Sequence, residues 1–462
     1  MGLGKISHKK FSLSPTGAEG GGEGVSKSRS MFTALFVLVF VLINWLSPAH
    51  AFGAKPLAVQ KGEDVWFAED HTLPMFAVVA SFPAGSAYDP NGKAGLAAFA
   101  AALMDEGAGN LNGRQFHSAL ADKAIQLEVE PSRDWTVVSI VSLSANAKDA
   151  FALLKLALTR PRFDADAIAR VRAQMLQNID RQDEDPSEVA GREFHHLFFG
   201  WHPYAHPVAG DRGGLNAVQR GDLKAFAAAH WVRAGLKIAV AGDIGAPALT
   251  AYLKSTFGAL SGKPLPPLPP VGKLGAAGVH RIAMDVPQPN AAFGMAGVMR
   301  DDPDFIPAYV ANYILGGGGA SSRLTEDVRE KKGLTYDIST ELSDMRRAAT
   351  VEGLVATRAD AMGDTLSAIR DAFARFAAEG PTAQELTDAK TYLTGSYPLA
   401  FSSDTGTASQ LGAFQRAGLD VGYVARRNSL IDAVTLDDVR RVARRVFDPN
   451  RLTIVVAGTM KK

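Results

Sequence analysis

The chain carries one arrangement of strands and helices twice, on either side of a proline-rich segment. The run Leu-Lys-Ile-Ala-Val-Ala-Gly at residues 236–242 resembles Leu-Thr-Ile-Val-Val-Ala-Gly at residues 452–458, and each run follows a helical pattern. Each half also begins with two strand-like runs, at 65–68 and 77–82 and again at 280–286 and 292–297. Long helical patterns lie between them, at 164–181 and 359–378. The repeat predicts an α+β fold of two similar domains, each with helices packed on a mostly antiparallel sheet; the alternative is a chance likeness of short apolar strands.

A cluster of prolines marks the boundary between the two halves. Pro264, Pro266, Pro267, Pro269 and Pro270 stand in one short segment, where their density disfavours helix and central strand and favours an extended linker. We therefore expect a leader at 1–51, an N-terminal domain at 52–259, a linker at 260–278 and a C-terminal domain at 279–462, arranged as a clamshell.

Composition excludes several classes of function. The chain has 49 Lys and Arg against 48 Asp and Glu, so its net charge of +1 offers no electrostatic basis for binding nucleic acid. It has no cysteine, which excludes disulfides, thiolate catalysis and cysteine-ligated zinc.

The N-terminal residues have the layout of a secretory signal. Lys27 and Arg29 precede an apolar run at 34–43, and Ser-Pro-Ala-His-Ala at 47–51 offers an Ala-x-Ala cleavage site. The apolar run is shorter than the roughly 20 residues of a membrane span, although an uncleaved anchor is the alternative. We expect a mature chain that starts near Phe52 and is exported to a bacterial periplasm.

A helical segment in the first half resembles the signature of a known enzyme family. Residues 92–104 read Gly-Lys-Ala-Gly-Leu-Ala-Ala-Phe-Ala-Ala-Ala-Leu-Met. The run Gly-Leu-Ala at 95–97 resembles the frame of the zinc motif Gly-Leu-Ala-His-x-x-Glu-His-Met in the pitrilysin/insulinase family of metallopeptidases. In that motif two histidines four residues apart bind zinc, and a glutamate on the same helical face activates the metal-bound water.

The residues that perform this chemistry are missing. Ala98 and Ala102 stand at the two histidine positions, and Ala101 stands at the glutamate position. The resemblance places the family's remaining ligand, a glutamate on a later helix, at Asn178. Asparagine is a weak neutral ligand, so we expect no metal and no cofactor in this chain.

Two other groups of residues offer metal donors. Asp105 and Glu106 lie one turn later and do not rebuild the lost face. Glu193, His195 and His196 precede His202 and His206, and we interpret these histidines as packing or surface residues, with a metal site as the alternative.

A glycine-rich run in the second half resembles the second-domain signature of the same family. Residues 315–324 read Leu-Gly-Gly-Gly-Gly-Ala-Ser-Ser-Arg-Leu, and residues 325–336 continue Thr-Glu-Asp-Val-Arg-Glu-Lys-Lys-Gly-Leu-Thr-Tyr. No Gly-Lys-Ser/Thr follows the glycines, which argues against a phosphate-binding loop. We expect Ser321 or Ser322 to cap a helix, Gly333 to end it, and a strand to carry Tyr336.

The resemblance assigns substrate contacts to this run. It implies that Arg329 and Tyr336 hold the substrate carbonyl near the scissile bond. It also implies that Gly316, Gly317, Gly318 and Gly319 shape the wall of a substrate chamber. The alternative is an ordinary surface arginine and a core tyrosine.

Together these features predict a non-catalytic, substrate-binding subunit of a heteromeric zinc metallopeptidase that degrades peptides. The chain is similar in this respect to the partner subunit of bacterial two-chain peptidases and to the alpha subunit of mitochondrial processing peptidase. A homologous partner with an intact zinc motif would supply the zinc and the base, and this chain alone would be inactive. The alternatives are a structural subunit with a vestigial chamber, and catalysis by another mechanism, for which no Gly-x-Ser-x-Gly motif is present.

Overall fold

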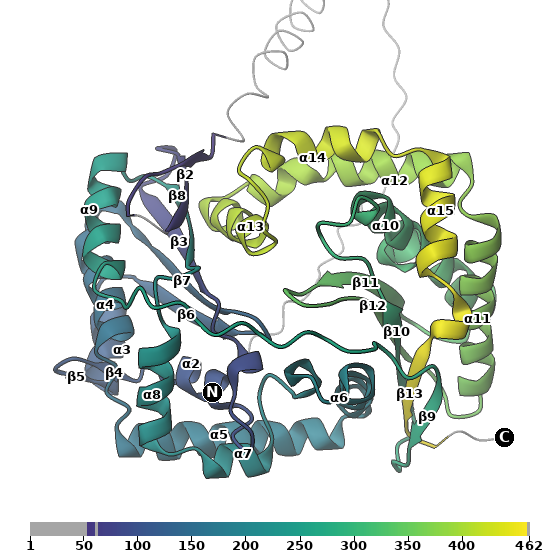
Figure 1. Ribbon diagram of the computed structural model, residues 1–462, viewed down its shortest axis with the longest axis horizontal. Helices are drawn as coiled ribbons and strands as arrows, with labels where there is room; N and C mark the ends of the chain where they lie inside the picture. Colours follow the sequence, from purple (N-terminus) through teal and green to yellow (C-terminus); the bar gives the residue numbers. More distant parts are fainter. Residues whose placement is uncertain (1–52, 61–62, 460–462) are drawn as a thin grey trace, which may run out of the picture. The chain divides into compact units, whose positions relative to one another are not determined.

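The computed structural model describes residues 53–60 and 63–459, so the predicted leader and its cleavage site lie outside the described residues. Two larger sheets and a two-stranded pair of β4 and β5 make up its strands (Figure 1). The first sheet has the order β1-β2-β8-β3-β7-β6 and the second the order β11-β12-β10-β13-β9. Their strands are β1 Lys55–Pro56, β2 Asp64–Glu69, β3 Met75–Phe82, β4 Gly107–Ala108, β5 Leu111–Asn112, β6 Gln126–Pro131, β7 Thr136–Leu143, β8 Lys237–Gly242, β9 Gly278–Ile282, β10 Asn290–Ala296, β11 Ile338–Asp344, β12 Ala349–Ala356 and β13 Thr453–Ala457.

The two sheets have the same topology, which confirms the predicted repeat and the α+β fold class. Strands β2, β8, β3, β7 and β6 stand in the same order as β9, β13, β10, β12 and β11. In each sheet the closing strand pairs in parallel with the first strand of the repeat, as β8 does with β2 and β13 with β9. The remaining pairs in both sheets are antiparallel.

Helices connect and cover the strands. They are α2 Leu96–Ala102, α3 Gly113–Ala121, α4 Ala147–Thr159, α5 Ala165–Glu184, α6 Pro186–Phe199, α7 Arg212–Ala217, α8 Arg220–His230, α9 Ala246–Phe257, α10 Phe305–Asn312, α11 Met362–Glu379, α12 Ala383–Gly395, α13 Asp404–Arg416, α14 Tyr423–Asp432 and α15 Leu436–Val446. The predicted helical patterns at 164–181 and 359–378 correspond to α5 and α11. A capping box fixes the start of α15, where Thr435 and Asp438 bond each other's backbone N–H.

One helix from each half packs on the sheet of the other half (Figure 1). Helix α13 of the second half contacts β3 and β8 of the first sheet, and α6 of the first half contacts β10 and β13 of the second sheet. Gln415 on α13 makes the first contact specific, because its buried Nε2 donates to the carbonyl of Asp64 at 2.8 Å and that of Ile238 at 3.2 Å. The halves are thus joined by packed helices as well as by the chain that links them.

This exchange explains why the middle of β3 is apolar at every position from Phe76 to Ala80. In β3, Phe76 and Val78 belong to the core of the first half, while Ala77 and Val79 pack with Leu411 of α13. Because both faces of the strand are covered, the sequence shows a continuous apolar run instead of an alternation.

The proline-rich segment contains neither helix nor strand from residue 261 to residue 277. Its backbone carbonyls are held by side chains of the first half. Tyr88 donates its hydroxyl to the Pro266 carbonyl at 3.0 Å, and His202 Nε2 bonds the Pro269 carbonyl at 3.1 Å.

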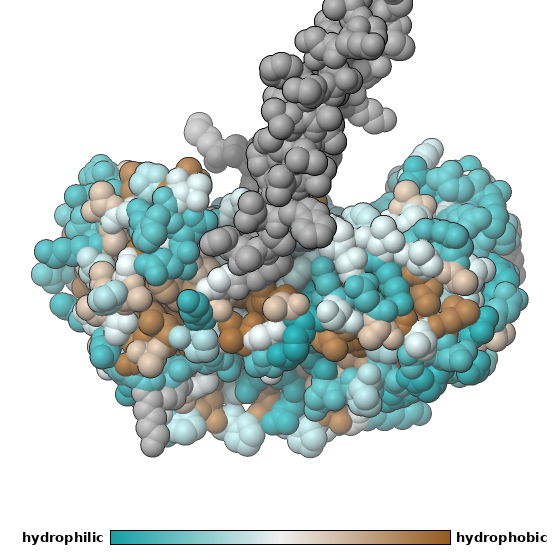
Figure 2. All heavy atoms as spheres, turned by 90° about the horizontal axis from the view of Figure 1, so that it is seen from above, coloured by the Kyte–Doolittle hydropathy of each residue, from teal (hydrophilic) through white to brown (hydrophobic). Residues whose placement is uncertain are grey.

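No helix among residues 53–60 and 63–459 is long and apolar enough to cross a membrane. On the face drawn in Figure 2, hydrophobic residues stand in separate groups among hydrophilic ones.

Candidate functional site

The degenerate zinc helix is α2, and its geometry is set by residues that come before it. The carboxylate of Asp89 accepts from the backbone N–H of Gly95 at 2.7 Å and from that of Ala97 at 2.8 Å, which anchors the start of the helix. Burial raises the pKa of Asp89 to about 7, and the backbone hydrogen bonds oppose this shift. Ala98 and Ala101 are buried and Ala102 is exposed, so two of the three methyl groups are packed in the protein.

Asn178, which was predicted to stand at the position of the third zinc ligand on a later helix, lies on α5. Helix α5 contacts α2, and the guanidinium of Arg172 lies 5.5 Å from the centre of the Phe99 ring. However, Asn178 is exposed, and its Oδ1 accepts from Gln174 at 3.3 Å and also from Arg181 on its own helix.

These residues do not fit a zinc ion. Alanine has no donor atom, and the one amide oxygen among the four positions already accepts two hydrogen bonds within α5. Within the described residues, one group of potential metal ligands is close enough to share an ion, namely Asp105, Glu106 and His117. His117 Nε2 lies 3.2 Å from Asp105, and Glu106 forms an ion pair with Arg170, whose positive charge opposes a bound cation.

The histidines between 195 and 206 include two with clear structural partners. His195 on α6 places Nδ1 2.8 Å from the Gly191 carbonyl and Nε2 3.0 Å from Glu352 Oε2 on β12, so it joins the two halves. His202 is fully buried; its Nδ1 accepts from the Tyr204 backbone N–H at 3.2 Å, and burial lowers its pKa.

Gly316, Gly317 and Gly318 of the glycine-rich run lie close to neighbouring residues of the second half. Residues Tyr313–Gly317 and Thr325–Glu330 are π-helical, a conformation that occurs frequently at functional sites. A Cβ added at Gly316 would lie 2.3 Å from Thr340 Oγ1 and 2.9 Å from Leu324 Cδ1, and one added at Gly317 would lie 3.0 Å from Asn312 Nδ2. The run Gly316–Gly319 does not line the cavity that contains Arg329 and Tyr336.

The ends of the following helix agree with the predicted signals. Ser322 is the cap, because its Oγ accepts from the Thr325 backbone N–H at 3.3 Å. Gly333 has φ +62° and its N–H bonds the Arg329 carbonyl at 2.9 Å, which terminates the helix. The expected strand starts later than predicted, because β11 begins at Ile338 and Tyr336 lies in the bend before it.

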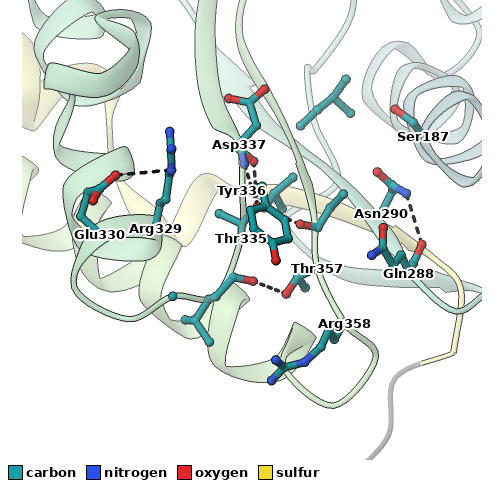
Figure 3. Close-up of a pocket in the computed structure, with 15 residues that line it drawn as sticks. Ser187, Gln288, Asn290, Arg329, Glu330, Thr335, Tyr336, Asp337, Thr357 and Arg358 are labelled. Atoms are coloured by element: carbon teal, nitrogen blue, oxygen red, sulfur yellow. Dashed lines mark hydrogen bonds and ion pairs between the residues drawn. The ribbon is translucent and has the colours of Figure 1, made fainter. Parts of the chain in front are cut away.

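Arg329 and Tyr336 line one cavity of about 800 Å³ (Figure 3). The Tyr336 residue is 91% exposed, so it is not a core tyrosine. The side chain of Arg329 is 47% exposed, and its one ion pair within the described part of the chain is a long one of 3.4 Å to the adjacent Glu330. Both side chains are therefore free to meet a ligand, and an exposed aromatic ring of this size is suited to a contact surface.

Sequence reasoning missed the residues that other elements bring to this cavity. Asn290 opens β10, Arg358 follows β12, and Ser187 comes from α6 of the first half (Figure 3). Each is an ordinary polar residue in its local sequence, and no spacing rule relates it to Arg329 or Tyr336.

Comparisons with known proteins identify the family of both halves of the chain. Residues 65–212 match the family described as insulinase (peptidase family M16), and residues 217–393 match the peptidase M16 inactive domain. A solved structure of a peptidase M16 inactive domain from Pseudomonas fluorescens is 30% identical, covers 88% of this chain and 98% of its own, and superposes with a TM-score of 0.83.

This chain belongs to the M16 family. Among its M16 relatives, a non-peptidase homolog from Helicobacter pylori is 25% identical over 86% of this chain and 92% of its own. The probable beta subunit of mitochondrial-processing peptidase from Arabidopsis thaliana is 24% identical over 82% of this chain and 73% of its own. A protease structure from Helicobacter pylori shares the fold, with a TM-score of 0.80 at 17% identity, over 88% of this chain and 99% of that one.

Proposed function

We propose that this chain is the non-catalytic, substrate-binding subunit of a heteromeric M16 zinc metallopeptidase that degrades peptides. A homologous partner subunit supplies the zinc and the general base, and this chain supplies Arg329 and Tyr336. The observation that carries the proposal is the contrast between the two sites. The metal positions hold alanine and an asparagine engaged within its own helix, whereas Arg329 and Tyr336 share an open cavity.

The chemistry of the retained pair suits a substrate carbonyl. A guanidinium and a phenolic hydroxyl both donate hydrogen bonds, and such donors stabilise the negative charge that develops on a carbonyl oxygen during hydrolysis. A structural subunit would have no need to keep these two donors exposed, which favours the peptidase subunit over the scaffold alternative. The basic, apolar and Ala-x-Ala segments of the leader support a periplasmic location for the complex.

The decisive experiment reconstitutes the complex. The chain is purified alone and together with a zinc-motif M16 protein encoded beside it, and zinc content and peptide hydrolysis are measured for each. We expect no zinc and no hydrolysis for the chain alone, and chelator-sensitive hydrolysis for the pair. One equivalent of zinc in the lone chain, with chelator-sensitive cleavage, would contradict the proposal.

Point variants then test the two donors. Within the complex, Arg329→Ala or Tyr336→Phe should lower kcat by about 10²-fold, the scale for removing one transition-state donor, without changing assembly or zinc content. Matched controls are Arg281→Ala on β9 and Tyr392→Phe on α12, both exposed and outside the cavity. Unchanged kcat in the Arg329 and Tyr336 variants would show that these two residues do not contribute to catalysis by the complex.

A further inference from the structure

A second cavity of about 880 Å³ lies where the two halves meet and shares no residue with the cavity of Arg329 and Tyr336. The turn between β6 and β7 forms one side, and the turn between β11 and β12 forms another. The carboxylate of Asp134 joins them by accepting from the Arg346 backbone N–H at 2.8 Å, and it also accepts from the Tyr204 hydroxyl at 2.5 Å. The cavity is therefore built from both halves of the repeat.

Four arginines line this cavity, and none of them forms a salt bridge with another described residue. They are Arg133, Arg300, Arg346 and Arg416. Arg133 Nε donates to the Tyr204 carbonyl at 3.0 Å, and Arg416 Nη1 donates to Ser81 at 3.0 Å. The remaining donors of both guanidinium groups are available, because an arginine has five N–H groups in a planar fork.

The other two arginines rest on aromatic rings. The guanidinium of Arg300 lies 4.2 Å from the Phe305 ring centre and 5.1 Å from that of Tyr423, and that of Arg346 lies 5.5 Å from the Trp135 ring centre. Aromatic faces hold a guanidinium in place without neutralising its charge.

The acidic residues that line the cavity form no salt bridge with these arginines, although the charges of Glu352 and Asp134 act on Arg133. Glu352 bonds His195 at 3.0 Å and Thr350 at 2.5 Å, and Asp134 is engaged as described above. Asp301 and Asp344 are exposed, so solvent and salt screen their charge.

Two of the arginines, Arg133 and Arg416, are half-buried and form no salt bridge with another described residue. Burial lowers the pKa of Arg133 although the charges of Glu352 and Asp134 raise it, and burial lowers the pKa of Arg416 although the charge of Glu130 raises it. A desolvated cation raises the free energy of the empty cavity, and an anion that enters would relieve this cost.

The size and the apolar lining identify the kind of anion. The volume is far greater than a phosphate or a few waters would need, and it is in the range of sites for larger organic ligands. Met299 and Met345 also line the cavity, and methionine adapts to side chains of different shape. We propose that this cavity binds a peptide segment through its glutamate or aspartate side chains, held by the fork of Arg416 and by Arg346, which is stacked on Trp135.

The test measures binding to the full chain without a partner. It uses fluorescence anisotropy with two labelled peptides of equal length, amidated at the C-terminus, that carry glutamates in one case and glutamines at the same positions in the other. We expect the glutamate peptide to bind about ten-fold more tightly, the size of one hydrogen bond to a charged group, and to lose this advantage at high salt. Equal affinity for the two peptides would overturn the proposal.

Point variants test whether the arginines of this cavity cause the preference for the glutamate peptide. Arg416→Gln and Arg346→Gln should each remove most of the preference for glutamate, whereas Arg114→Gln, an exposed change of equal charge on α3, should preserve it. An equal loss in all three variants would show a general charge effect and overturn the assignment to this cavity. If Arg416→Gln does not fold, Arg346→Gln, a change at an exposed residue, and the salt dependence of the unmodified chain still decide.

Two further binding measurements identify which chemical group the cavity binds. Inorganic phosphate that binds as tightly as the glutamate peptide would overturn the assignment to a peptide. A preference seen only when the peptide has a free C-terminal carboxylate would overturn the assignment to side chains. The choice of a peptide as the ligand rests on the proposed peptidase function. Binding is measured without cleavage, however, so a complex that fails to hydrolyse peptides and a chain that fails to prefer glutamate are separate results.

Discussion

Gly95 belongs to the Gly-Leu-Ala run of the zinc motif, and the close packing of the chain requires a glycine at this position. Its φ is +94°, and a Cβ there would lie 2.8 Å from the Ala209 carbonyl oxygen and 2.9 Å from Gly210 Cα. Only glycine allows the two backbones to approach so closely in this conformation. The need for Gly95 does not depend on a metal, so its presence beside three alanines is explained by packing.

Gly95→Ala should therefore lower the free energy of unfolding by about 2–4 kcal/mol, since it adds backbone strain to a steric clash. Chemical denaturation measures this loss. Gly92→Ala is the matched control, because Gly92 has φ +76° and a Cβ added there would meet no atom of the described residues within 4 Å. This control should cost about 1 kcal/mol, the strain of the left-handed conformation alone. Equal losses for the two variants would contradict the role of close packing at Gly95.

At the scale of the elements, the sequence predicted the repeat well because repeated strands and helices leave local patterns. The closing strands and the long helices lie close to their predicted positions. The exchange of α6 and α13 left no such pattern, since an apolar helix face fits the sheet of either half equally well. The start of β11 was misplaced because nothing in the sequence distinguishes the bend at Tyr336 from the strand that follows.

Gln415 tests the contact of α13 with the first sheet. Gln415→Ala removes the donor to two backbone carbonyls of β2 and β8 and leaves a cavity, so we expect a loss of about 1–3 kcal/mol in chemical denaturation. Gln384→Ala on α12, where the side chain is exposed and bonds Asp388 on the same helix, should change stability by less than about 0.5 kcal/mol. A similar effect of the two substitutions would show that the buried amide contributes nothing specific.

For the molecule as a whole, the candidate site could be predicted only where its residues are neighbours in sequence. Arg329 and Tyr336 belong to one continuous segment, and the alanines of α2 to another. Ser187 reaches the same cavity through the packing of α6 on the second sheet, and Arg358 reaches it through the pairing of β12 with β11; no pattern in the chain encodes these contacts. The same applies to the arginine-lined cavity, whose residues come from both halves.

The ion pair of His195 with Glu352 makes the junction of the halves sensitive to acid. Burial raises the pKa of Glu352. Hydrogen bonds from His195 and Thr350, together with the charge of Arg133, lower it by more than burial raises it, so the pKa in the folded protein lies below the ordinary 4.5. A depressed pKa means that the unfolded chain binds a proton more readily than the folded one. The stabilisation by Glu352 is therefore complete above about pH 4.5 and is lost as the pH falls through the lower folded value.

Glu352→Gln should remove this dependence. Thermal unfolding is followed from neutral pH to below the ordinary pKa of a glutamate, and the variant should be less stable at neutral pH by about 1–3 kcal/mol. The gap should close as the pH falls, because the unmodified chain then loses the same interaction. Other carboxylates with lowered pKa, such as Asp438 at about 2, are present in both proteins and cancel in the difference. Glu128→Gln, an exposed change on β6, should leave the curve of the unmodified chain unaltered, and a gap for Glu352→Gln that stayed constant with pH would show that the carboxylate charge does not hold the halves together.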